Sequence, residues 1–228
     1  MNAAQYEEFA RNRGLTEYAF DGAILPSAWR TCNSRLLFYL KENYGYRGCG
    51  VTDIQKLAHC WYDNGIKTYR SVALLAASLH IALGRSAALS LQEFEDLKRS
   101  PTIVRESLNR VAIVNVKKTS GASKSDDREI RRESRRNADW LSWQLRQLEP
   151  KHIIAGGTVC WHSLTLDLDL FRHDGSVAKH SFIRKEGTLI YHASHPAARG
   201  RSFDPFRVHV NMTNAQRGQS DANLSPYI

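Results

Sequence analysis

Two short segments far apart in the chain end in polar residues that could recognise and activate a planar ligand. Residues 111–118 read VAIVNVKK, an apolar run ending at Asn115, and residues 191–199 read YHASHPAAR, which includes His195. In an open α/β sheet, ligands bind at the carboxyl ends of the strands, so an Asn after one strand and a His-Pro after another can converge on one site. An Asn amide offers both a donor and an acceptor, and a neutral His ring offers one of each. Together these residues predict a site that reads a nucleobase.

A third polar segment follows the first apolar run of the chain. Residues 41–48 read KENYGYRG, in which Glu42 or Asn43 could hold a water molecule and the glycines would let the backbone approach a ligand. The alternative is an ordinary loop between a strand and a helix, with side chains that only cap the helix.

The elements that must position these residues follow from four continuous apolar runs, at 35–40, 111–116, 152–155 and 188–191. Continuous rather than alternating apolarity indicates parallel strands that are covered on both faces. Helical spacing separates the runs: it predicts helices over 67–83 and 91–97, with stops at Gly84 and Pro101, and another over 130–148 whose first half is rich in arginine. We therefore expect an α/β fold, a three-layer α/β/α sandwich around a central, mainly parallel four-stranded sheet.

Length, charge and cysteine content limit the functional classes. A chain of 228 residues fits one domain over 1–228, with a core at about 24–210 and a loose polar segment from 211. Its 32 Lys and Arg residues against 23 Asp and Glu give a net charge of +9, which favours a polyanionic partner such as nucleic acid. The four cysteines have no Cys-x-x-Cys spacing, the amino terminus is polar, and no apolar run is long enough to span a membrane. We expect a reduced, cytoplasmic protein.

Taken together, the three polar segments resemble the motifs of the uracil-DNA glycosylase superfamily. The family's first motif is Gly-x-Asp-Pro-Tyr, Gly-x-Asn-Pro-Gly or Gly-Glu-x-Pro-Gly, and residues 41–45, KENYG, keep the Glu, the Asn and the final Gly but depart from it at Lys41 and Tyr44. Residues 114–118, VNVKK, are similar to the Thr-Asn-Val-Val-Lys stretch of the iron-sulfur branch, and residues 195–199, HPAAR, resemble the His-Pro-Ser/Ala motif. The resemblance extends over about 35–201 and is specific only when all three motifs are considered together.

The resemblance implies an enzyme that flips a pyrimidine out of DNA and hydrolyses its N-glycosidic bond, leaving an abasic site. It implies that Asn115 pairs with the base edge, that His195 stabilises the departing base, and that Asn43 positions the attacking water with support from Glu42. These roles suit the reaction, because the sugar gains oxocarbenium character while negative charge grows on the base. Gly45 stands where some relatives carry a Tyr that blocks substituents at C5, so we expect tolerance of C5-modified pyrimidines. These could include the hypermodified cytosines of phage DNA, which would make the protein an antiphage defence enzyme.

An aromatic side chain should stack on the flipped base. Tyr69 lies near the stacking position that the resemblance implies, with Tyr46, Trp61 and Tyr62 as alternatives. For each of these residues, packing in the core is the competing explanation.

Basic residues flank two of the motifs and are expected to contact DNA phosphates. Arg199 stands where some relatives insert an apolar wedge into the duplex, and would fill the gap or grip a phosphate instead. The competing explanation is a solvated basic surface. The expected DNA contacts are Lys117, Lys118, Lys124, Arg199 and Arg201.

No cofactor is expected. Where the iron-sulfur branch has cysteines after its Asn motif, this chain has Thr119 and Ser134, and the spacing of its His and Cys residues matches no familiar metal site. We expect a monomer that acts on DNA without an obligatory protein partner. Two other functions stay open: a nucleic-acid-binding protein without activity, and a hydrolase of free nucleosides or nucleotides.

Overall fold

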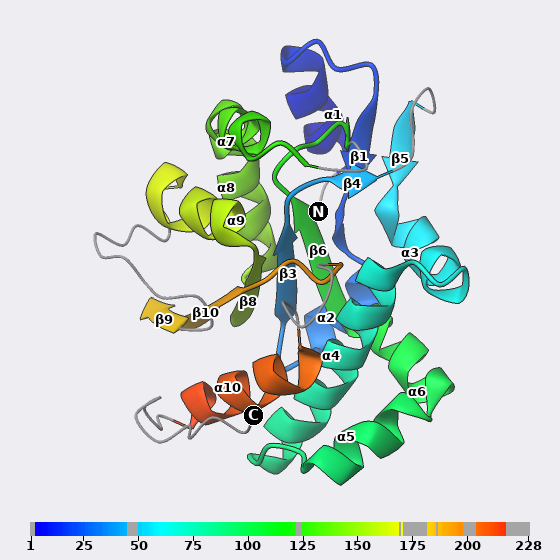
Figure 1. Ribbon diagram of the computed structural model, residues 1–228. Helices are drawn as coiled ribbons and strands as arrows, with labels where there is room; N and C mark the ends of the chain where they lie inside the picture. Colours follow the sequence, from blue (N-terminus) through cyan, green and yellow to red (C-terminus); the bar gives the residue numbers. More distant parts are fainter. Residues whose placement is uncertain are drawn as a thin grey trace.

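A six-stranded sheet forms the centre of the molecule (Figure 1). The computed structural model describes residues 3–44, 50–121, 125–168, 170, 182–185, 187–197 and 204–217. The order across the sheet is β2-β6-β3-β8-β10-β9. The strands are β2 (Gly22–Ala23), β3 (Leu36–Leu40), β6 (Val111–Asn115), β8 (His152–Gly156), β9 (Phe182–Lys185) and β10 (Thr188–Ala193).

The four middle strands are parallel and coincide with the four apolar runs of the sequence. Every residue of β3, β6, β8 and β10 is buried, which confirms that these strands are covered on both faces. The sheet is wider than predicted, because the short strands β2 and β9 pair antiparallel with its two edges. The protein is thus an α/β protein with a mixed, mostly parallel six-stranded sheet.

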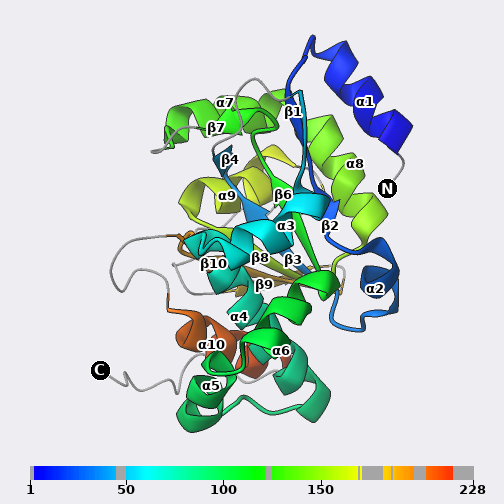
Figure 2. The same cartoon turned by 90° about the vertical axis from the view of Figure 1, so that its right-hand side faces the viewer.

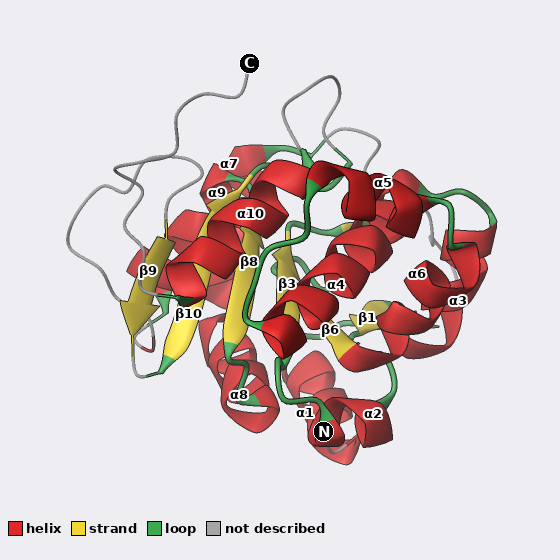
Figure 3. Cartoon of the chain, turned by 90° about the horizontal axis from the view of Figure 1, so that it is seen from below, coloured by secondary structure: helices red, strands yellow, loops and turns green. Residues whose placement is uncertain are grey.

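Alternate residues of each middle strand enter two separate hydrophobic cores. Leu36 and Phe38 of β3 pack with one group of helices, and Leu37 and Tyr39 pack with the other. In Figure 3, α4 and α10 lie toward one side of the strands and α8 toward the other. The first group contains α3 (Ile54–Asp63), α4 (Lys67–Arg85), α5 (Leu91–Lys98), α6 (Pro101–Glu106) and α10 (Pro205–Gln216), and the second α2 (Pro26–Thr31), α7 (Asp127–Arg136), α8 (Ala138–Leu148) and α9 (Thr158–His162).

A third, smaller core lies between the first helix and α8 (Figure 2). It joins α1 (Ala3–Asn12) to α8 through Tyr6 and Trp140, whose rings meet edge to face at 4.7 Å. The described residues also include a 3-10 turn at Ser107–Arg110 and a π turn at Ser163–Asp167.

Two of the predicted helices, over 67–83 and 91–97, agree with α4 and α5 in position and differ slightly at their ends. α4 runs through Gly84 to Arg85, and Ser86 then adopts a left-handed conformation with φ of 54°. Pro101 begins α6, where a missing amide hydrogen costs nothing, rather than simply ending α5. The segment from 211 was expected to be loose, but α10 continues to Gln216 and buries Met212.

The predicted helix over 130–148 is two helices, α7 and α8, which are separated by Asn137. The Asn137 amide donates to the carbonyl of Val116 at 3.3 Å, and its oxygen accepts from Arg13 at 3.1 Å. These bonds come from segments far away in the sequence, so the break was not visible in the local pattern.

Two small parallel pairs shape the end of the sheet at which β3 and β6 finish. β1 (Tyr18–Phe20) pairs with β5 (Val51–Asp53), and β4 (Asn43–Tyr44) pairs with β7 (Ser120–Gly121). The second pair fixes the segment after β3 beside the segment after β6. Among the described residues, no helix is long and apolar enough to cross a membrane.

Candidate active site

The three sequence motifs lie at one end of the sheet. In register, Leu40 of β3 is opposite Asn115 of β6, and Gly156 of β8 is opposite Ala193 of β10, two residues before His195. In Figure 1 this end lies toward β4 and α7. With neighbouring strands about 4.8 Å apart, β6 and β10 are separated by about 14 Å across β3 and β8. The fold therefore brings together the strand ends that carry Glu42, Asn115 and His195.

His195 is held as a neutral hydrogen-bond donor. The backbone N–H of Ala197 donates to its Nδ1 at 3.1 Å, which assigns the ring proton to Nε2. Burial and then the nearby Lys41 ammonium lower the pKa of His195 to about 4. At neutral pH the ring can offer Nε2–H to an atom that is gaining negative charge.

Asn115 is held in one orientation by a buried acid, Asp21. The Asp21 Oδ2 atom accepts from the Asn115 backbone N–H at 2.7 Å and from its side-chain Nδ2 at 3.2 Å. Asn115 is 2% exposed. The bonds found for Asn115 among the described residues use its backbone N–H and one amide hydrogen, which leaves Oδ1 and the second amide hydrogen for a ligand.

Asp21 is the centre of a buried polar cluster that the sequence analysis missed. Besides Asn115, its carboxylate accepts from Tyr6 at 2.7 Å, from Gln144 at 2.8 Å and from Lys118 at 2.9 Å. Burial lowers the pKa of Lys118, although Asp21 beside it acts in the opposite direction. A buried charge pair is tolerable only when further hydrogen bonds satisfy it, as they do here.

This cluster corrects the prediction for Lys118. Its side chain is 1% exposed and its ammonium lies on Asp21, so it does not face solvent as a phosphate contact would. The reason is the turn after β6, which directs Lys118 inward to the acid that precedes β2. Lys118 therefore acts on the position of Asn115 through Asp21.

Glu42 is a buried carboxylate, one of whose oxygens has no hydrogen-bond partner among the described residues. Its side chain is 5% exposed, and its Oε2 lies 3.4 Å from the Lys117 ammonium. Its Oε1 is buried without a hydrogen-bond partner among the described residues. A buried acceptor without a partner is a natural position for a water molecule.

Gly121 makes room for this carboxylate. A Cβ atom at Gly121 would lie 2.4 Å from Cδ of Glu42, far inside van der Waals contact. The absence of a side chain at Gly121 thus lets Glu42 lie directly over the backbone of β7 there. No signal in the sequence marked Gly121, because its partner is about 80 positions away in the chain.

Lys117 is occupied by two carboxylates. Its ammonium is 3.0 Å from Glu129 of α7 in addition to its contact with Glu42, and its side chain is only 10% exposed. The prediction that Lys117 binds phosphate is not supported by this arrangement, since a phosphate would have to compete with both acids.

The structure places Asn43 at the predicted site but buries Tyr69 in the core. Asn43 lies in β4 beside Ser120 of β7, at the same sheet end as Glu42, and its side chain makes no hydrogen bond among the described residues. Tyr69 is 5% exposed in the first core, with its ring 4.8 Å from that of Trp61. The position of Tyr69 is therefore explained by packing in the core and not by stacking on a base.

Five predicted site residues lie outside the described part of the chain: Gly45, Tyr46, Lys124, Arg199 and Arg201.

The two glycines at the end of β8, Gly156 and Gly157, allow close packing. A Cβ at Gly156 would lie 2.8 Å from Leu40 and 3.3 Å from Pro196, so this glycine lets the ends of β3 and β10 close around β8. Gly157 has a φ of +115°, and its N–H donates to the carbonyl of Ala193 at 2.8 Å. That N–H is therefore not aimed at a phosphate.

α7 attaches to both motif loops and carries free cations to the same end of the sheet. Asp127 pairs with Lys41 after β3 at 2.6 Å, and Glu129 pairs with Lys117 after β6. Between and beyond these acids, Arg128 and Arg132 are exposed, and neither forms an ion pair with a described residue. The arginine-rich pattern was visible in the sequence, but its position beside the site was not.

No metal centre is formed by the part of the chain that the structure describes, where no three His, Cys, Asp or Glu side chains cluster to hold an ion. His192, on β10 three residues before His195, stacks on Trp161 at 5.1 Å between ring centres.

Neither the models of known protein families nor the sequences of curated proteins match this chain.

Proposed function

We propose that the protein is a monofunctional DNA glycosylase that hydrolyses the N-glycosidic bond of a flipped pyrimidine and leaves an abasic site. The proposal includes a fold of the uracil-DNA glycosylase kind, with helices in layers on both faces of four parallel strands in the order β6-β3-β8-β10. The observation that carries it is the neutral His195, whose Nε2–H is available at the sheet end that also holds Asn115 and Glu42.

In the proposed reaction, the bond between the base nitrogen and C1′ breaks while a water oxygen bonds to C1′. Negative charge grows on a pyrimidine oxygen, to which His195 donates from Nε2. Asn115 binds the base edge with its free Oδ1 and its second amide hydrogen. Glu42 accepts the water proton at Oε1, while the Lys117 ammonium stays beside its other oxygen.

The proposed roles of Glu42 and Asn43 are the reverse of the order expected from the sequence. Among the described residues, Glu42 has a buried oxygen without a partner and a backbone that makes room for it at Gly121, whereas no hydrogen bond fixes the Asn43 amide. We therefore assign the water to Glu42 and a supporting role to Asn43.

The base is proposed to be uracil or a C5-modified pyrimidine, including hypermodified cytosine of phage DNA. Asp21 fixes Asn115 so that one donor and one acceptor face a ligand, and this pair can complement either a uracil or a cytosine edge. Contacts with the DNA backbone are assigned to Arg128 and Arg132 of α7, the free cations beside the site.

A second candidate function is the hydrolysis of free nucleosides or nucleotides. It is favoured by the carboxylate pairing of Lys117 and Lys118, which removes two of the cations expected to bind a DNA backbone. Such an enzyme would need the base-reading residues but little of a basic rim.

The test is base release from uracil-containing, C5-modified and glucosylated DNA, single- and double-stranded, with free nucleosides as parallel substrates. Alkaline cleavage of abasic sites is the readout for DNA, and chromatography of the free base is the readout for both. We expect His195→Ala and Glu42→Gln to lower release by at least about a hundredfold, Asn43→Ala by less, and His59→Ala on α3 not at all.

Three other outcomes would each change the conclusion. Release from nucleosides alone establishes the second candidate function. Tight DNA binding without release on any substrate indicates a binding protein without activity. Release that is unaffected by His195→Ala contradicts the mechanism.

A further inference from the structure

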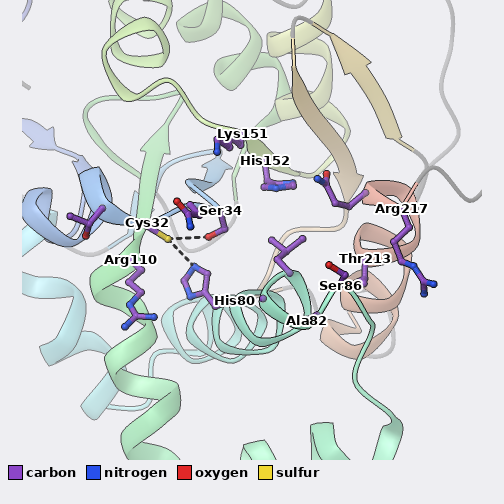
Figure 4. Close-up of a pocket in the computed structure, with 15 residues that line it drawn as sticks. Cys32, Ser34, His80, Ala82, Ser86, Arg110, Lys151, His152, Thr213 and Arg217 are labelled. Atoms are coloured by element: carbon purple, nitrogen blue, oxygen red, sulfur yellow. Dashed lines mark hydrogen bonds between the residues drawn. The ribbon is translucent and has the colours of Figure 1, made fainter.

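A cavity lined by described residues lies at the other end of the sheet from the proposed active site (Figure 4). Its volume is about 890 Å³, within the range of small-molecule sites. Its floor includes Ser34, two residues before β3, and His152, the first residue of β8. A ligand here would therefore sit at the amino ends of the parallel strands.

The lining of this cavity carries positive charge and no carboxylate. Arg110, Lys151 and Arg217 stand on three sides of it in Figure 4. None of the three forms an ion pair with a described residue, whereas Arg13, Lys41 and Lys117 each do. Three unpaired cations around one concave surface attract anions.

His152 adds an unsatisfied polar group to the floor. It is 5% exposed, and its Nδ1 has no hydrogen-bond partner among the described residues. Burial, followed by the charges of Arg184, Lys151 and His80, lowers the pKa of His152 to about 4. A buried ring nitrogen without a partner is costly unless a ligand satisfies it.

Cys32 supplies a nucleophile to the same cavity. Its Sγ is 3.0 Å from the hydroxyl of Ser34 and 3.8 Å from Nε2 of His80, and both side chains turn toward it in Figure 4. Burial raises the pKa of the Cys32 thiol, but hydrogen bonds with His80 and Ser34 and the His80 charge outweigh it and leave the pKa at about 6. A thiolate of this kind is typical of reactive cysteines.

We propose that this cavity is a modification site, at which Cys32 undergoes thiol–disulfide exchange with an acidic low-molecular-weight disulfide whose carboxylates are bound by Arg110, Lys151 and Arg217. The cavity gives the ligand space, its cations select the charge, and Cys32 provides the attacking sulfur. This proposal is independent of the proposed glycosylase activity.

The exchange balances without any further reagent. The Cys32 thiolate attacks one sulfur of the disulfide, a new S–S bond forms, and the original S–S bond breaks. The Cys32 sulfur is oxidised, the departing sulfur is reduced to a thiolate, and that thiolate takes a proton from water. The acidic group that stays attached to Cys32 remains among the cations of the cavity.

The test compares three symmetric disulfides that share the same two-carbon arms: dithiodipropionate, a dianion; bis(2-hydroxyethyl) disulfide, which is neutral; and cystamine, a dication. The rate at each cysteine is measured by quenching, peptide mapping and mass spectrometry. Cys60 is the internal control, since it is exposed on α3 and lines no part of this cavity.

With the neutral disulfide, Cys32 should react about sixfold faster at pH 6.5 than an ordinary exposed thiol of pKa near 8.5. Its thiolate content is roughly 75-fold higher, and its lower nucleophilicity reduces the rate by about 13-fold. At pH 8.5 the order should reverse. In the variant His80→Gln, the other titratable and charged groups among the described residues that line the cavity with Cys32 are Arg110, Lys151, His152 and Arg217, and the advantage at pH 6.5 should be lost.

The charge preference tests the cations separately. For each charged disulfide, the rate is divided by the rate of the neutral disulfide at the same cysteine. At low salt, this ratio for dithiodipropionate should be on the order of tenfold higher at Cys32 than at Cys60. For cystamine the ratio should be lower at Cys32 than at Cys60. The triple variant Arg110→Gln/Lys151→Gln/Arg217→Gln changes only exposed side chains and should remove this preference while keeping the pH dependence. The proposal is overturned if Cys32 reacts no faster than Cys60 at pH 6.5, or if the dianion has no advantage at Cys32.

Discussion

Removing the charge of Asp21 should destabilise the protein far more than removing any surface acid. Asp21 is fully buried and faces the buried Lys118 ammonium at 2.9 Å. In the variant Asp21→Asn, that ammonium stays in the core without a counter-charge, a situation that costs about 3–5 kcal/mol. For a chain of this size, such a loss lowers the melting temperature by roughly 6–20 °C.

The double variant Asp21→Asn/Lys118→Met separates the charge from the packing. Because the second change removes the unpaired ammonium, we expect it to restore most of the lost stability, with a coupling energy of about 2 kcal/mol or more. The control is Asp139→Asn, which removes the exposed partner of Arg13 and should cost less than about 1 kcal/mol. Urea unfolding followed by tryptophan fluorescence gives the free energy of unfolding for each variant.

The single variant also has a predictable pH dependence. Without Asp21, burial acts on Lys118 alone and lowers its pKa further, so the folded protein binds fewer protons than the unfolded chain up to the ordinary lysine pKa of about 10.4. Stability rises with pH wherever the unfolded state binds more protons, so Asp21→Asn should regain part of its loss between pH 7 and pH 9. A loss under about 1 kcal/mol, or a double variant as unstable as the single one, would refute the description of this cluster.

Three further predictions concern the proposed active site. Gly121→Ala should lower base release by about a hundredfold, because the new Cβ would displace the Glu42 carboxylate, and single-turnover rates measure this. The neutral His195 ring should contribute no change in that rate between pH 5.5 and pH 8, since its pKa is about 4 and protonation of Nδ1 would break its bond with the N–H of Ala197; a pH–rate profile tests this. Arg128→Gln/Arg132→Gln should reduce the slope of log affinity against log salt by about 1.8 on duplex DNA, as measured by titration at several salt concentrations.

Matched variants identify effects that are not specific to the site. Gly84→Ala also adds a Cβ to a glycine, but in open space on α4, and should leave release unchanged while stabilising the helix by about 0.5–1 kcal/mol. Arg30→Gln/Arg146→Gln removes the same charge from α2 and α8 and should leave the salt slope unchanged. Full activity of Gly121→Ala would count against the role of Glu42. A rate midpoint near pH 6.5 that is lost in His195→Ala would count against a neutral His195. An unchanged salt slope in the α7 variant would count against DNA contacts by Arg128 and Arg132.

The middle of the sheet could be predicted from the sequence because its signal is local. Strands β3, β6, β8 and β10 are buried on both faces, so nearly every residue in them is apolar and each run is continuous. β2 has only Gly22 and Ala23, and β9 is half-exposed, so neither carries such a signal. Edge strands of this kind are defined by their pairing with a neighbour rather than by composition.

Burial of single polar residues could not be predicted in the same way. Lys118 and Tyr69 have the residue types of a DNA contact and a stacking platform, yet contacts from distant segments bury one against Asp21 and the other against Trp61. Asp21 itself lies 94 positions before Asn115 and 123 before Gln144, and no local pattern indicates that these residues meet. Strand ends could be located from the sequence, whereas the partners of their side chains could not.

The position of Lys118 changes how a basic residue next to a recognition motif should be interpreted. A lysine that binds phosphate would weaken DNA binding uniformly when it is replaced, and would lower the salt dependence. Lys118 instead neutralises the carboxylate that fixes the Asn115 amide, so its replacement should loosen that amide and change which base edge is accepted. If the proposed function holds, discrimination between bases and salt dependence should therefore be separable, with the first governed by the Asp21 cluster and the second by the exposed arginines of α7.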